Sequence, residues 1–219
     1  MLKRALLILQ KDVAIEMSQL RMLPTAAIMA ILIILIFAVV MGQETNAAGA
    51  AAILAVSFVF CGIVASERSF DSETANGAID ALRITAGSDA IFWGKWLLTA
   101  GLLLLIEIWN CAVFCVIFNF EMYGYLAEMI VLLVLFNIAF ASVGAVFSAM
   151  VAQCRQKGFI LTILVLPILI GPVIATTMGL KMIFSGYGLS GISNWLKFMA
   201  GFDIIFTALA WMTFEKVIE

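Results

Sequence analysis

Long apolar runs alternate with short polar intervals along this chain. Apolar residues dominate six segments, namely residues 24–41, 47–65, 91–118, 127–152, 159–180 and 196–213. An α-helix needs about 20 such residues to cross the hydrocarbon core of a bilayer, and a helix satisfies its own backbone hydrogen bonds there. The pattern therefore predicts an all-α polytopic membrane protein, in which residues 1–219 form a single domain of six transmembrane helices.

Residues 1–22 show a different pattern, with apolar and polar positions on opposite faces of a helix. The apolar positions are Leu2, Leu6, Leu9, Val13, Met17 and Leu20, and the residues that lie largely away from them are Lys3, Arg4, Lys11, Ser18, Gln19 and Arg21. Such a helix lies in the membrane interface with its basic residues near anionic lipid headgroups. The alternative is a helix packed on a soluble neighbour, and the membrane segment that follows immediately favours the interfacial position.

Composition agrees with a membrane location and argues against several kinds of site. The chain is 65% hydrophobic and 12% charged, whereas an average soluble domain is roughly half apolar and a quarter charged. It has no histidine, and its four cysteines form no pattern typical of a zinc site or a disulfide framework. Cys111 and Cys115 share a helix face in apolar surroundings, which favours packing thiols over a redox or metal pair. A net charge of −2 without a basic cluster argues against nucleic-acid binding.

The basic residues predict the orientation of the chain. Six crossings place both termini on one side, together with Lys3, Arg4, Lys11, Arg21, Arg68, Arg83, Lys95, Arg155, Lys157 and Lys216. The opposite side holds Lys181 and Lys197. Because Lys and Arg accumulate in cytoplasmic loops, we expect both termini to be cytoplasmic.

Residues 67–90 form the one long polar interval between apolar segments, and this orientation makes the interval cytoplasmic. Phe70, Ala78, Ile79 and Leu82 can share one face of a helix that begins near Ser72, and this helix is too short to be stable alone. We interpret it as a coupling helix that docks into a groove of a cytoplasmic partner. The alternative is a solvated loop lying on the bilayer. The predicted docking residues are Glu67, Arg68, Phe70, Glu73, Gly77, Ile79, Asp80 and Leu82.

A few polar residues and two prolines interrupt the apolar segments. A charge inside a membrane is costly and by default functional, so Glu107 and Asp203 are candidate functional residues. The alternative is a position near the outer headgroups, which suits Asp203 better because it lies close to the outer end of its segment. Pro167 and Pro172 are expected to bend or break the fifth helix.

No motif for catalysis is present. The chain lacks the Walker A glycine loop, the H-E-x-x-H metalloprotease motif and the nucleophile elbow of hydrolases. We therefore expect a non-catalytic membrane subunit, with no metal site, whose ATPase activity resides in a partner.

Two stretches carry a family resemblance. The first is the central interval, with Glu67, Arg68, Phe70, Gly77, Asp80, Leu82 and Lys95, and the second is GFILTILVLPILIGPVI at residues 158–174, with Leu166, Pro167 and Pro172. In both, and in size and six-span layout, the chain resembles the haem exporter protein B family, the membrane subunit of the cytochrome c maturation ABC transporter. One departure is the loop after Leu82, where ITAGSD replaces the prolines often found there and leaves the end of the docking helix open.

The resemblance implies an ABC-2 type permease fold and a homodimer in the bacterial inner membrane, paired with cytoplasmic ATP-binding cassette subunits. It also implies partnership with a haem-handling membrane protein and a periplasmic haem chaperone. The partner would bind ATP, and haem is a possible cargo. No directly bound cofactor is expected, because the chain offers no histidine and only buried Cys, scattered Met and interfacial Tyr as haem ligands.

The function that the resemblance implies is to couple ATP hydrolysis to haem export or to release of the haem-loaded chaperone. Two other functions stay open on the sequence. One is an ABC-2 type exporter permease for lipid, polysaccharide or another hydrophobic cargo. The other is a scaffold or membrane-enzyme subunit with no ATPase partner.

Overall fold

The computed structural model describes residues 2–19, 22–42, 45–69, 87–152, 154 and 157–218. Its elements are α1 (Leu2–Gln19), α2 (Met22–Met41), α3 (Ala47–Arg68), α6 (Ser88–Phe118), the 3-10 turn η1 (Tyr123–Tyr125), α7 (Leu126–Val151), α8 (Lys157–Phe184) and α9 (Leu189–Ile218). Within these ranges there is no strand, and six helices are long and apolar enough to cross a membrane. The all-α membrane fold expected from the sequence is thereby confirmed for the residues described.

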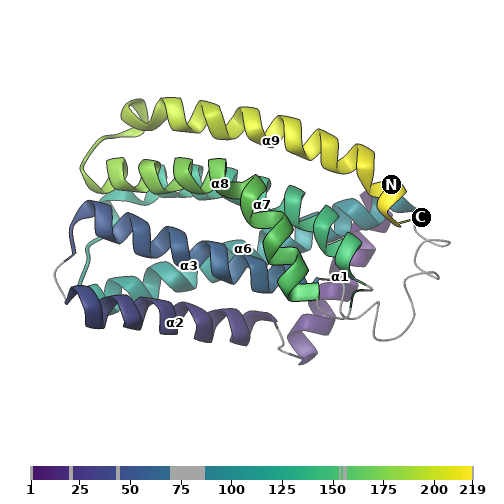
Figure 1. The fold of residues 1–219 in the computed structure, drawn as a ribbon, viewed down its shortest axis with the longest axis horizontal. Coiled ribbons are helices and arrows are strands. Elements are labelled where there is room, and N and C mark those ends of the chain that lie inside the picture. Colours follow the sequence, from purple (N-terminus) through teal and green to yellow (C-terminus); the bar gives the residue numbers. More distant parts are fainter. Residues whose placement is uncertain are drawn as a thin grey trace.

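The six long helices lie side by side, and α1 lies at the end of the bundle where α9 finishes (Figure 1). We call this end, which holds α1 and the last turn of α9, the terminal end. α7 packs against α8 and α9, and α3 packs against α2 and α8. α6 contacts α1, α2, α3, α7 and α9. A shift of α6 would therefore displace side chains on most of the other helices.

Large buried side chains and small residues together hold the bundle closed. Phe58 of α3, Phe114 of α6 and Phe140 of α7 are each at most 1% exposed. Gly62 of α3 faces the Phe140 ring so closely that a Cβ there would lie 2.6 Å from a ring carbon. Such close approach matters in a membrane, because lipid is as apolar as the helix surfaces and packing must provide the attraction.

Polar side chains fix where two of the helices begin. The Glu16 carboxylate of α1 accepts hydrogen bonds from the backbone N–H groups of Met22 (2.7 Å) and Leu23 (2.9 Å), at the start of α2. The Asn46 side chain accepts a hydrogen bond from the Gly49 N–H at 2.8 Å and caps α3. The first N–H groups of a helix have no partner within the helix, so these acceptors stabilise both starts.

The sixth membrane helix begins earlier than the sequence predicts, and the fifth bends without breaking. α9 begins at Leu189 rather than at residue 196, which moves Asp203 from near the outer end of a span to the middle of a helix. α8 continues through Pro167 and Pro172 as one helix, so neither proline breaks it. Its ribbon changes direction part-way along (Figure 1), as expected where proline removes a backbone hydrogen bond.

Candidate functional site

The predicted coupling helix lies outside the described residues, between the end of α3 and the beginning of α6. Phe70, Glu73, Gly77, Ile79, Asp80 and Leu82 fall in residues 70–86, so their docking role stays a prediction. Arg68 ends α3, and nothing is described of its side chain. The flanking residues Ser69 and Gly87 are described. The contacts of the flanking segments indicate how a coupling helix would act on the bundle.

A buried lysine connects both flanks of this interval. The Lys95 Nζ donates a hydrogen bond to the Ser69 carbonyl at 2.6 Å and forms an ion pair with Asp12 Oδ2 at 2.8 Å. Lys95 is 0% exposed and Asp12 is 5% exposed. We call Asp12, Ser69 and Lys95 the Lys95 junction. It ties α1, the end of α3 and the second turn of α6 together, because each segment supplies one of its polar groups.

A close contact between α1 and α6 allows this ion pair to form. Gly94 of α6 lies against α1 so closely that a Cβ there would lie 2.8 Å from the Ile8 side chain and 3.2 Å from the Ala5 carbonyl. Ala5, Ile8, Asp12 and Glu16 form the buried face of α1, at the three- and four-residue steps of a helix. Sequence reasoning missed this second face because it followed the large apolar residues alone.

The apolar face that the sequence predicts for α1 is largely turned away from the bundle. Leu6, Val13 and Met17 are exposed, whereas Leu9 is half-buried. These exposed side chains are therefore available to enter a bilayer, and the interfacial position of α1 stays a prediction. α1 thus has two working faces, one apolar and one that buries two carboxylates.

Glu67 links the end of α3 to the beginning of α8. A Cβ built on Gly158 would lie 2.4 Å from the Glu67 Oε1, so the carboxylate sits directly over this glycine. Gly158 is in the first turn of α8, where unpaired N–H groups and the helix dipole favour a negative charge. The carboxylate of the predicted docking residue Glu67 therefore packs against the start of α8, where a negative charge is favourable.

Hydrogen bonds also tie the first half of α6 to α7 and α9. The Trp96 indole N–H donates to the Ser142 hydroxyl at 2.9 Å, and Ser142 lies 2.7 Å from the Thr207 hydroxyl. Ser142 donates its own proton to the Ile138 carbonyl at 2.7 Å, so Thr207 is the donor to Ser142. Near the terminal end, the Trp211 indole N–H donates to Asp89 Oδ1 at 2.8 Å. Both links bring α9 to α6.

The second candidate set, inside the membrane segments, divides between two places. Glu107 of α6 and Asn137 of α7 are each 2% exposed, and the Asn137 amide donates to Glu107 Oε2 at 2.8 Å. Glu107 Oε1 and Asn137 Oδ1 have no hydrogen-bond partner in the part of the chain that the structure describes. Glu107 therefore lies within the bundle, bonded to a neighbouring helix.

One turn further along α6, Asn110 forms a separate set of contacts with α3. Asn110 accepts a hydrogen bond from the Ser57 hydroxyl and donates to the Ile106 carbonyl at 2.9 Å, and its amide lies 3.8 Å from Cys61 Sγ. Cys61 in turn lies 3.3 Å from the Ala26 carbonyl of α2. These contacts hold α2, α3 and α6 together and do not bring Asp203 near Glu107.

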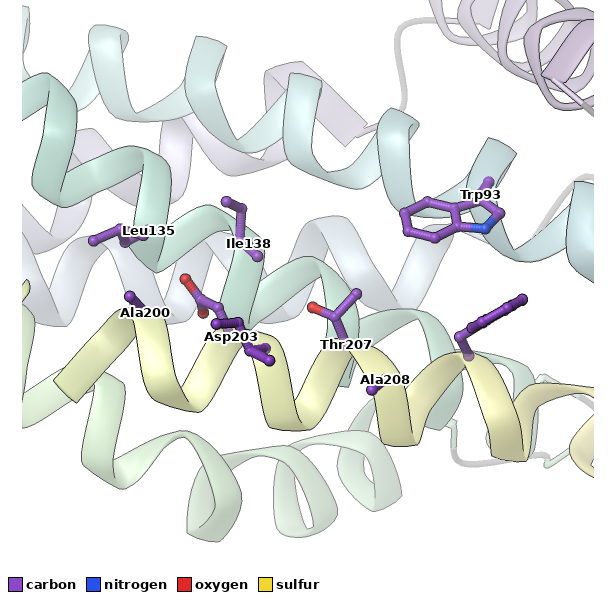
Figure 2. Close-up of a pocket in the computed structure, with 9 residues that line it drawn as sticks. Trp93, Leu135, Ile138, Ala200, Asp203, Thr207 and Ala208 are labelled. Atoms are coloured by element: carbon purple, nitrogen blue, oxygen red, sulfur yellow. The ribbon is translucent and has the colours of Figure 1, made fainter. Parts of the chain in front are cut away.

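Asp203 lies apart from this set, on α9. It is 5% exposed and lines a groove between α9, α7 and α6 (Figure 2). Among the residues described, no group of three or more His, Cys, Asp and Glu side chains could hold a metal ion. The buried polar residues named above therefore form helix-to-helix contacts, apart from Asp203, which lines the groove.

Comparison with protein families gives one match and a search of curated proteins gives none. The model of the family described as CcmB protein matches residues 3–219, which is nearly the whole chain. This match agrees with the resemblance carried by the central interval and by residues 158–174. The chain belongs to the CcmB family, the membrane component of the ABC transporter for haem export and cytochrome c maturation.

Proposed function

We propose that this chain transmits the movement of a separate cytoplasmic ATPase subunit to the membrane helices of a cytochrome c maturation transporter. The chain itself has no nucleotide-binding motif, so ATP is bound and hydrolysed by that partner. The output is haem export or release of the haem-loaded periplasmic chaperone. The observation that carries this proposal is the Lys95 junction, which fastens the segments on both sides of residues 70–86 to α1 and α6.

The proposed transmission runs through the flanks of the docking interval. A coupling helix that shifts in the ATPase groove pulls on Ser69 and Gly87. Ser69 is bonded to Lys95 of α6, and Glu67 sits over the start of α8. Trp96 then carries a shift of α6 to Ser142 and α9. Buried, fully packed contacts transmit displacement because a close-packed interior does not deform continuously.

The wider assembly follows from family membership and charge. We propose a homodimer that carries two ATP-binding cassette subunits and works with a haem-handling membrane protein and a periplasmic haem chaperone. The excess of basic residues in the segments that the predicted topology places with both termini supports an inner-membrane orientation with both termini in the cytoplasm. Haem is a cargo of the assembly in this proposal, and the chain binds no cofactor of its own.

The docking step is tested by substitutions on the apolar face of the predicted coupling helix. Phe70→Asp and Leu82→Asp place a charge in the proposed ATPase groove, so co-purification of the ATPase should fall by about tenfold or more, since burying an unpaired charge is costly. Asn76→Asp, on the opposite face, is the matched control and should leave co-purification unchanged. Normal assembly of Phe70→Asp with the ATPase would refute docking through this face.

The cargo is tested in a deletion strain of the native host. Loss of c-type cytochromes with unchanged membrane lipids and surface polysaccharides supports the proposed function. Normal c-type cytochromes together with altered lipids would instead favour the exporter of another hydrophobic cargo.

A further inference from the structure

An open groove runs along α9 on a surface that the proposed function does not use. It has a volume of about 480 Å³ and is bounded by α9, by Leu135 and Ile138 of α7, and by Trp93 of α6. Figure 2 shows the Asp203 carboxyl directed from α9 towards Leu135 and Ile138. The rest of the lining is largely apolar, and its other polar atoms are the Thr207 hydroxyl and the indole N–H groups of Trp93 and Trp211. The groove thus presents one carboxyl in largely apolar surroundings.

The carboxyl of Asp203 has no hydrogen-bond partner among the described residues. The residue is 5% exposed, and neither carboxyl oxygen forms a hydrogen bond within the described ranges. The Thr207 hydroxyl, one turn along α9, donates to Ser142, and the Trp211 indole N–H donates to Asp89. A buried polar group without a partner is costly, and buried carboxyls in membrane helices are almost always paired. Asp203 is therefore an incomplete contact in the isolated chain.

The depth of Asp203 excludes a lipid headgroup as the missing partner. Trp195 and Trp211, whose residue type marks the two membrane interfaces, each lie eight residues from Asp203 along α9. At 1.5 Å per residue, Asp203 is about 12 Å from each, which places it near the bilayer midplane. Headgroups begin about 15 Å from that plane, so the amine of a phospholipid does not reach the carboxyl.

Charge excludes a second copy of this chain. The basic residues of the long described helices are Arg68, Lys95, Lys157, Lys181, Lys197 and Lys216, and all of them lie towards a helix end. Two copies joined through this groove about a twofold axis would bring Asp203 towards Asp203, and like carboxylates repel. The complementary group must come from another protein.

We propose that this groove receives a transmembrane helix of a different membrane protein, which places a Lys, Arg or other hydrogen-bond donor against Asp203. Small residues favour such a contact, because Ala200, Gly201 and Ala208 line this stretch of α9 and a Cβ on Gly201 would meet nothing within 4 Å. The groove is thus a docking site for a helix, with Asp203 as its polar anchor. This assignment does not depend on the cargo or on ATPase docking.

The test is photo-crosslinking in native membranes, with the full chain and its natural partners present. A photo-reactive phenylalanine at position 208 lies in the groove, and the same residue at position 205, where Ile205 is 58% exposed outside the groove, is the control. We expect position 208, and not position 205, to form an adduct with a different membrane protein. Sequencing of the adduct should place a donor side chain at mid-span in the captured helix.

Variants of Asp203 then separate a specific contact from proximity. Asp203→Leu should lower the adduct yield at position 208 by about fivefold, which corresponds to the loss of one hydrogen bond between membrane helices. A charge swap, with Asp203→Lys in this chain and Asp in place of the donor residue of the captured protein, should restore the adduct yield at position 208. Adducts with lipid only, adducts between two copies, equal yields at 208 and 205, or an unchanged yield in Asp203→Leu would each overturn the proposal. Crosslinking from position 208 in a chain that retains Asp203 tests the proposal even if an Asp203 variant misfolds.

Discussion

Asp12 and Asp203 are each only 5% exposed, yet their surroundings differ. Asp12 faces the Lys95 ammonium at 2.8 Å, and Lys95 in turn donates to the Ser69 carbonyl. Asp203 faces hydrocarbon, and both of its oxygens lack hydrogen bonds in the described part of the chain. Burial alone therefore does not define the role of a carboxyl, because the identity of the group opposite decides what it does.

The contrast separates a finished contact from an open one. At the Lys95 junction, charges and a carbonyl from three segments satisfy one another, so the junction stabilises the chain and stiffens the flanks of the docking interval. In the groove, the same kind of side chain is left for another protein to complete. Substitutions in the Lys95 junction are therefore expected to destabilise the chain itself. Substitution of Asp203 is expected to weaken only the assembly with another protein.

The largest effect is expected from Lys95→Met. The substitution removes the buried partner of Asp12 Oδ2 and of the Ser69 carbonyl and leaves Asp12 only the more exposed Lys11 at 3.0 Å, and breaking a buried ion pair on one side costs about 3–5 kcal/mol. The free energy of unfolding of the purified chain, measured in mixed micelles, should fall by that amount. The double variant Lys95→Met with Asp12→Leu should recover most of the loss, since no charge is then stranded. Equal stabilities for the single and double variants would show that the ion pair does not hold α1 on α6.

A smaller loss is expected where α1 touches α6. Gly94→Ala places a Cβ 2.8 Å from Ile8 and 3.2 Å from the Ala5 backbone, and overpacking of this kind costs about 1–3 kcal/mol. Gly101→Ala on the same helix is the matched control, because nothing lies within 4 Å of its Cβ. The control should be neutral or stabilising by up to about 1 kcal/mol, as expected for Gly to Ala in a helix. Thermal unfolding of both variants in detergent gives the comparison, and similar values for the two would contradict the close approach.

The Glu107 contact is expected to contribute less than either of these. Glu107→Leu removes the acceptor of the Asn137 amide, and a hydrogen bond between membrane helices is worth on the order of 1 kcal/mol. Glu107→Gln keeps a carbonyl oxygen in place and should retain most of that stability. Unfolding of the two variants in mixed micelles distinguishes them. A loss as large for Gln as for Leu would mean that the charge, and not the hydrogen bond to Asn137, is what the site requires.

The helices could be predicted from the sequence because the length of an apolar run is a local property. Tertiary contacts could not, because they join residues that are far apart in the sequence. The six membrane helices follow from runs of about 20 apolar residues. The pairing of Asp12 with Lys95 had no such signal, since the two residues are far apart in the chain and on different helices. The depth of Asp203 was misjudged for a related reason. The start of α9 at Leu189 lies in a Gly- and Ser-rich stretch that reads as a loop, so the helix was begun too late.

The last prediction is the effect of Asp203→Leu on the purified chain, which is expected to be small and, unlike the losses above, not destabilising. This substitution removes a buried carboxyl that has no partner within the described residues and replaces it with a side chain that matches Leu135 and Ile138. The free energy of unfolding should therefore stay the same or rise by about 1 kcal/mol, because a buried unpaired polar group is costly. Thr176→Leu, at another buried polar position, should not stabilise the chain, because its hydroxyl contacts Met199 Sδ at 3.9 Å in close packing. A clear loss of stability in Asp203→Leu would show that the carboxyl already has a partner within the chain, and the groove would then be closed to a helix from outside.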